Sequence, residues 1–241
     1  MPSEEGHSTA VFPVTRWSLI QTSADPESLE LICATYWRPV YSFLRHNGHS
    51  REDAEDFTQS FFSELLKKGS LDRAEQEKGK LRSFLLGALK RHLSRENQHK
   101  NRQKRGGGAV HLALPTSEMD FQDAENQYAS LPVDDQSPDL VFERRWTIEL
   151  LLRAHQRLER DYQAAGKEKE YHLLKSAVEE TSEIDAENAA RELGVKEASV
   201  RVLIHRLRKN FRAAFKEEIA NTVVDRTEVD QEYQRLLQVF S

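Results

Sequence analysis

The sequence predicts an all-α protein of two small helical domains joined by an acidic flexible linker, the second domain containing a helix-turn-helix. Three observations support this fold class. Apolar residues recur at spacings of three and four, whereas the alternation typical of strands is nearly absent. Of the 241 residues, 31% are charged and 38% are hydrophobic, which is typical of a soluble helical chain. Opposite charges are segregated in blocks, which indicates separate segments.

The predicted organisation has five segments. They are an N-terminal extension (1–26), a first helical domain (27–105), an acidic linker (106–139), a helix-turn-helix domain (140–215) and a C-terminal helical extension (216–241). The linker begins with three glycines and carries seven acids but no Lys or Arg between Ser117 and Asp139. Such a composition cannot bury a core, so we expect an extended linker.

Helices are expected in both domains and in the last segment. The predicted ranges are 27–46, 51–68, 79–100, 140–165, 168–180, 185–193, 196–220 and 226–239. Ser50 and Asp53 have the spacing of a capping box, so a helix should begin there. Gly48 and Gly166 are expected to end helices. Cys33, the single cysteine, follows two apolar residues and is expected to be buried.

The segment from Asn188 to Arg212 has the pattern of two helices joined by a tight turn. Gly194 follows the first helix, where the chain must reverse and glycine can adopt a positive φ. Apolar residues stand where crossing helices need contacts: Ala189, Leu193, Val195, Val200 and Leu203. This pattern indicates a helix-turn-helix.

The second of these helices has two different faces. Its apolar positions are Val200, Leu203, Ile204, Leu207 and Phe211, and its basic stripe is Arg201, His205, Arg208 and Arg212. A helix with an apolar back and a basic front fits the major groove of DNA. The alternative without DNA contact is a solvated basic helix in an ordinary helical bundle.

A second basic helix is expected near the end of the first domain. Although the net charge of the chain is −5, ten basic residues and one acid between Lys78 and Arg105 give that stretch a charge of +9. The helix from Lys80 is expected to bury its apolar side and to expose its cations, which are Lys80, Arg82, Lys90, Arg91 and Arg95. Such a basic surface can follow a phosphate backbone.

The helix before it presents an acidic and polar face beside an aromatic one. Phe57, Phe61 and Leu65 share the apolar side, and Asp53, Asp56, Gln59 and Ser63 share the other. A polar face of this kind suits docking on a basic protein surface. The alternative is a face that only contacts solvent.

These motifs together resemble the extracytoplasmic-function sigma factors of bacterial RNA polymerase. The segment from Asp53 to Gln59 (DAEDFTQ) is similar to the family's polymerase-docking signature, and Leu193 to Arg208 is similar to its promoter-recognition motif. The segments Phe12–Leu19 and Glu218–Val223 resemble a long, planctomycete-type group of the family. Ser60 departs from the acidic residue that often follows the docking glutamine, and 185–188 is more polar than usual.

The resemblance implies a promoter-specificity subunit that makes no chemical bonds and needs no cofactor. Its partners would be core RNA polymerase (β′ clamp helices and β flap) and promoter DNA. The implied polymerase contacts are Asp53, Asp56 and Gln59. The implied contacts to the upstream promoter element are Lys196, Arg201, Val202, His205, Arg206, Arg208 and Lys209, of which Arg201, Val202, His205 and Arg206 face bases. The implied contacts to the melted element are Asp72, Arg73, Lys80, Arg82, Lys90 and Arg91, with an extruded base held by the loop 70–75.

Two other functional classes are weighed against this one. A stand-alone helix-turn-helix transcriptional regulator would bind DNA without polymerase, but it would leave the docking motif unexplained. A nucleic-acid enzyme is disfavoured because the sequence holds no P-loop, HExxH or nucleophile motif. The nine histidines include no pair in a convincing metal-ligand context, and His92 and His99 are expected to face solvent or phosphate. We therefore expect no metal and no catalytic residue.

The ends of the chain bear on location and regulation. The polar, acidic start is unlike a signal peptide, and no apolar run is long enough for a membrane span, so a cytoplasmic protein is expected. In the C-terminal extension, apolar residues recur at helical spacing from Val229 to Phe240. This amphipathic tail either completes a core, folds back to compete with DNA, or docks on a regulator such as an anti-sigma factor.

Overall fold

The computed structural model describes residues 26–67, 80–102, 118–129, 137–178, 184–223 and 225–240. Across these residues the chain is helical without a strand, which confirms the all-α fold class. The α-helices in chain order are α2 (Pro26–His46), α3 (Arg51–Leu65), α4 (Leu81–Arg102), α5 (Glu118–Ala129), α6 (Pro138–Ala164), α7 (Glu168–Leu174), α8 (Ala186–Leu193), α9 (Glu197–Ala220) and α10 (Val229–Gln238). Two short 3₁₀ turns, η2 (Lys175–Ala177) and η3 (Arg226–Glu228), follow α7 and precede α10.

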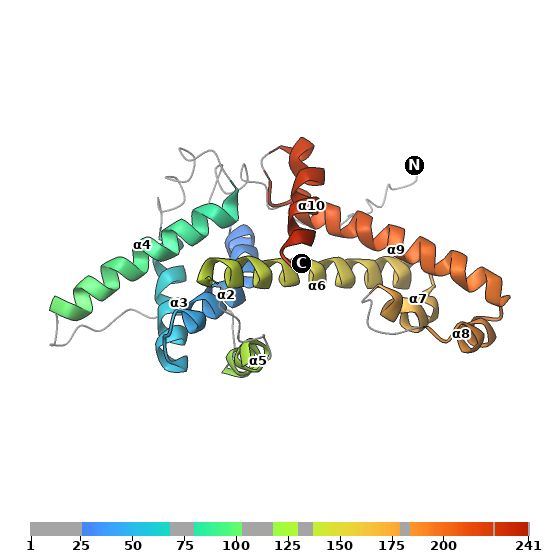
Figure 1. Ribbon diagram of the computed structural model, residues 1–241, viewed down its shortest axis with the longest axis horizontal. Helices are drawn as coiled ribbons and strands as arrows, with labels where there is room; N and C mark the ends of the chain where they lie inside the picture. Colours follow the sequence, from blue (N-terminus) through green and yellow to red (C-terminus); the bar gives the residue numbers. More distant parts are fainter. Residues whose placement is uncertain are drawn as a thin grey trace, which may run out of the picture.

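The long helix α6 forms the axis of the molecule (Figure 1). Helices α2, α3, α4 and α5 gather around its first half, whereas α7 and α9 pack along its second half and α8 lies beyond its end, against α7 and α9. With 27 residues at 1.5 Å per residue, α6 is about 40 Å long. Helix α10 stands across the middle of the molecule, beside the end of α9.

The first hydrophobic core lies between α2 and the first half of α6. α2 is buried on most of its surface, and Ile32, Tyr36, Val40 and Leu44, one turn apart from each other, form one of its buried rows. They pack against α6, where Trp146 is fully buried and its ring lies 6.3 Å from the Tyr36 ring. Cys33 is buried as expected, and burial raises the pKa of its thiol to about 12.

A second, smaller core lies at the other end of α6. It consists of Leu158, Tyr162, Tyr171, Leu174, Ala189, Ala190, Val200 and Leu207. Phe211 of α9 packs against both cores. The domain boundaries drawn from the sequence stay a prediction, but the first core also includes Phe142 and Leu150 of α6 and Leu236 of α10. The predicted first domain therefore shares its core with the segments that follow it.

The expectation of an extended linker is wrong for residues 118–129, which form α5. Phe121 and Ala124 are buried, and the Phe121 ring meets the Trp37 ring edge-on at 5.1 Å. Phe121, Ala124 and Tyr128 lie three and four residues apart, so they share one face of a helix. The acidic average composition conceals this short apolar stripe.

Local sequence signals account for several helix ends. The Ser50 hydroxyl accepts a hydrogen bond from Asp53 N at 3.1 Å, which confirms the predicted cap of α3. Gly48, Gly166 and Gly194 have φ values of 87°, 67° and 65°, in the left-handed region that glycine adopts without strain. Gly194 directly follows α8, and Gly48 and Gly166 are the second residues after α2 and α6, so each lies at the end of a helix as expected.

Candidate nucleic-acid interface

Helices α8 and α9 are joined by a tight turn around Gly194. The Asp185 carboxylate accepts a hydrogen bond from Asn188 N at 2.9 Å and so caps α8. This contact accounts for the polar character of residues 185–188. After Gly194 the chain reverses, and Val195 N donates to the Ala190 carbonyl at 3.0 Å. Two helices are thereby held at a fixed angle to each other.

The apolar contacts of this unit agree in part with those expected. Ala189 and Val200 are buried, whereas Leu193 and Leu203 are only partly buried. Val195 is 38% exposed, because it lies in the turn beyond the last residue of α8. The packing between α8 and α9 is therefore carried by small residues of α8 against the first turn of α9.

All seven side chains assigned to the upstream element are exposed. They are Lys196, Arg201, Val202, His205, Arg206, Arg208 and Lys209. Val202, a branched apolar side chain, is 59% exposed. From 196 to 212, six Lys or Arg residues and one Glu give a charge of +5. We call this exposed surface the α9 basic face.

The cations of the α9 basic face differ in how they are held. Arg208 Nε donates to the Ala177 carbonyl at 2.9 Å, so its guanidinium is anchored to the turn after α7. Arg206 lines a hollow of about 340 Å³ between α9 and the end of α6, together with Tyr162 and Asn210. Among the described residues, Arg201 and Lys209 form no ion pair within 4.0 Å, so their charges are available to a polyanion.

The second basic surface, on α4, is exposed in its middle part. Lys90, Arg91 and Arg95 are exposed. Lys90 pairs with Asp139 at 2.6 Å and Arg95 pairs with Glu64 at 2.7 Å, both at the surface. Surface ion pairs of this kind contribute little to stability, so a phosphate can replace their acids at small cost.

Arg82 is not exposed, and this corrects the prediction made from the helical pattern. Its side chain is 2% exposed and pairs with Glu232 of α10 and, at 3.4 Å, with Glu143 of α6. The guanidinium carbon lies 4.7 Å from the centre of the Trp146 ring. Lys80, which is partly buried, also pairs with Glu232. Lys80 and Arg82, which were assigned to the melted element, are therefore paired with acids of the chain itself.

The remaining contacts assigned to the melted element cannot be compared with the structure. Asp72 and Arg73, with the loop 70–75 that was expected to hold an extruded base, lie outside the described residues. Their assignment stays a prediction.

The three polymerase contacts expected on α3 lie along its polar side. Asp56 is exposed and Gln59 is partly exposed, whereas Asp53 takes part in the cap with Ser50. Phe57, Phe61 and Leu65 are buried on the other side, as predicted. The two outward residues are free to contact a partner without disturbing the core.

His92 was expected to face solvent or phosphate, but it is 4% exposed and lies between α3 and α4. Its Nδ1 is 2.7 Å from Glu64 Oε2, and its Nε2 is 2.9 Å from Ser60 Oγ. Burial raises the pKa of Glu64. The hydrogen bond with His92 and the charge of Arg95 lower this pKa by more than burial raises it, so the net change is a decrease. Ser60, the departure from the docking signature, is therefore a partner of His92.

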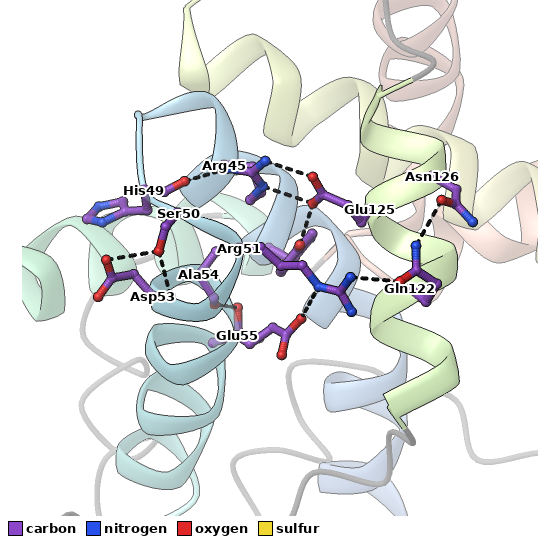
Figure 2. A network of polar contacts seen from close by, with 12 residues as sticks. Arg45, His49, Ser50, Arg51, Asp53, Ala54, Glu55, Gln122, Glu125 and Asn126 are labelled. Carbon is purple, nitrogen blue, oxygen red and sulfur yellow. Dashed lines mark hydrogen bonds and ion pairs between the residues drawn. The ribbon is translucent and has the colours of Figure 1, made fainter.

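Helix α5 is attached to α2 and α3 by a polar network (Figure 2). Glu125 receives two hydrogen bonds from Arg45, at 2.7 and 2.9 Å, and one from the Tyr41 hydroxyl. The hydrogen bond from Arg45 lowers the pKa of Glu125. Arg51 Nη1 donates to Gln122 at 2.7 Å. Nothing in the acidic composition of this segment identifies Glu125 as a bidentate partner of an arginine.

Three further observations complete the description. In the described part of the chain, no group of three or more His, Cys, Asp or Glu residues could hold a metal ion. No described helix is both long and apolar enough to cross a membrane. No family model matches the chain, and neither a curated protein nor a solved structure matches it.

Proposed function

We propose that the chain is a sigma factor of the extracytoplasmic-function class, which binds core RNA polymerase and directs it to promoters. The α9 basic face carries this proposal. It combines a charge of +5, exposed arginines and an outward Val202 on a helix that follows a tight turn. Arginine and small apolar side chains are the groups that recognise guanine and the thymine methyl in the major groove.

The arrangement of the two basic surfaces supports the same proposal. The α4 cations and the α9 basic face lie toward opposite ends of the molecule, and α6 connects them (Figure 1). The length of α6, about 40 Å, corresponds to about 12 base pairs of duplex at 3.4 Å per pair. One chain can thus contact two separated elements of the same DNA, which strengthens binding through effective concentration.

The test is run-off transcription from a promoter library with purified core polymerase. A sigma factor yields specific transcripts only when the chain and the core enzyme are both present. Asp56→Ala combined with Gln59→Ala should weaken binding to core polymerase and leave the fold intact, because both side chains lie off the core. A chain that binds a promoter equally well without polymerase would instead be a stand-alone regulator.

Base contacts and phosphate contacts on α9 can be separated by their selectivity. Arg206→Ala should cost about 1–3 kcal/mol of promoter affinity and relax the choice of base at one upstream position. Lys209→Ala should weaken binding to all sequences alike and reduce the salt dependence by about one unit of slope. Equal losses from both variants on every promoter would contradict the separation of roles.

A further inference from the structure

Helix α10 is built into the junction of three other helices. Leu236 is buried in the first core, and the Tyr233 ring meets the Phe215 ring of α9 edge-on at 5.7 Å. Arg144 of α6 donates to the Val239 carbonyl at 2.8 Å. The amphipathic tail therefore completes the core, which was one of the three expected roles.

The polar side of α10 meets the beginning of α4. Glu232 is completely buried and pairs with both Lys80 and Arg82, although Lys80 is 152 residues away in the chain. Arg235, one turn further along α10, pairs with Glu143 at 2.7 Å, and Glu143 also contacts Arg82. Two acids from α10 and α6 therefore surround the Arg82 guanidinium.

The burial of Arg82 and Glu232 is not explained by stability alone. Arg82 is almost completely buried, yet its Nη2 has no hydrogen-bond acceptor among the described residues. A buried ion pair recovers its desolvation cost only when all its donors and acceptors are satisfied, and apolar side chains of the same volume are often more stable. A guanidinium with an unused N–H donor is, however, well suited to donate to an oxyanion such as a phosphate.

We propose that α10 is an internal competitor for nucleic acid, in which the Glu232 carboxylate occupies the position of a phosphate at Lys80 and Arg82. This inference rests on the proposed function, since it assigns to these two cations the binding of a single-stranded backbone. Helix α10 covers the cation pair in the free protein. Binding of the strand displaces Glu232, and α10 leaves the junction.

The size of the effect follows from counterion release. Each phosphate contact to a single strand adds about 0.7 to the slope of log affinity against log salt concentration. A tenfold reduction in salt, from 1 M to 0.1 M, therefore strengthens binding about fivefold for each contact. Releasing both cations should tighten binding about 25-fold at 0.1 M salt and increase the slope by about 1.4.

The experiment compares two variants of the full chain that differ from it by the same charge. Glu232→Gln removes the competing carboxylate, whereas Glu228→Gln removes an exposed acid just before α10. Binding to a fluorescein-labelled strand of about 15 nucleotides is measured by anisotropy across a salt series. We expect Glu232→Gln to tighten binding between five- and 25-fold, and Glu228→Gln to behave as the unmodified chain. Adding Lys80→Ala to Glu232→Gln should remove a large part of the gain, which general loosening would not.

A measurement on the unmodified chain covers the case in which Glu232→Gln does not fold. Hydrogen exchange of residues 229–238 is recorded with and without the strand. Protection of α10 should fall when the strand binds. Unchanged protection with the strand bound, or equal affinity of the two glutamine variants, would overturn the competitor role while leaving the proposed function intact. Failure of every variant to bind the strand at low salt would instead contradict nucleic-acid binding by α4 itself.

Discussion

Replacement of the buried Arg82–Glu232 pair by apolar side chains gives a direct measure of its energy. Arg82→Met leaves Glu232 buried with Lys80 as its remaining cation, and Glu232→Leu leaves Arg82 with Glu143. Removing one partner of a buried pair typically costs about 3–5 kcal/mol. Because each remaining side chain keeps one partner here, we expect each single variant to lose about 2–3 kcal/mol of unfolding free energy, at or just below the lower end of that range.

The double variant should be close to the unmodified protein. Both buried charges are replaced by apolar side chains, Glu143 keeps Arg235 as its partner, and Lys80, which loses Glu232, is partly exposed to solvent. Replacing a whole buried pair in this way is often neutral or stabilising, so the double variant should lie within about 1 kcal/mol of the unmodified chain. The single losses sum to about 4–6 kcal/mol, so the two substitutions are expected to be coupled by about 3–7 kcal/mol rather than additive.

Urea unfolding of the four proteins at neutral pH, followed by the far-ultraviolet circular dichroism of the helices, measures this coupling. The slope m should be the same in all four if the folded state is retained. A double variant that loses the sum of the two single losses would refute the reasoning, because it would show that the two side chains contribute independently.

Two further outcomes concern other parts of the molecule. Gly194→Ala should reduce the free energy of unfolding by about 1 kcal/mol. A side chain is strained at a φ of 65°, even though the space around this position is open. An unchanged midpoint of thermal unfolding would contradict this prediction. The hydrogen bond from Arg45 lowers the pKa of Glu125 in the folded protein. The contribution of this carboxylate to the free energy of unfolding is therefore complete above its unfolded pKa of about 4.3, and it is lost as the pH falls below that value. Glu125→Gln should therefore be less stable than the unmodified chain at pH 7, and the difference should shrink below about pH 4. A difference that stays constant with pH would show that the carboxylate charge is not responsible.

The positions of the helices other than α5 could be predicted because their signals are local. The cap at Ser50, the positive φ at Gly194 and the buried stripe of Phe57 and Phe61 each depend on residues within one or two turns of the chain. The same holds for α9, where apolar and basic residues alternate with the helical period, so that the exposure of Arg201 follows from the sequence alone.

The role of an individual charge could not be predicted in the same way, because its partner lies on a distant segment. The pattern of α4 places Arg82 and Arg91 among the same outward cations, yet Arg82 is buried and Arg91 is exposed. Only the approach of α6 and α10 to the beginning of α4, which brings Glu232 across 152 residues to Lys80, distinguishes them. The sequence by itself thus determined where most helices begin, end and turn, since these depend on neighbouring residues, although α5 was missed within its acidic segment. Tertiary packing alone decided which charges are covered, because burial depends on what another segment brings to that surface.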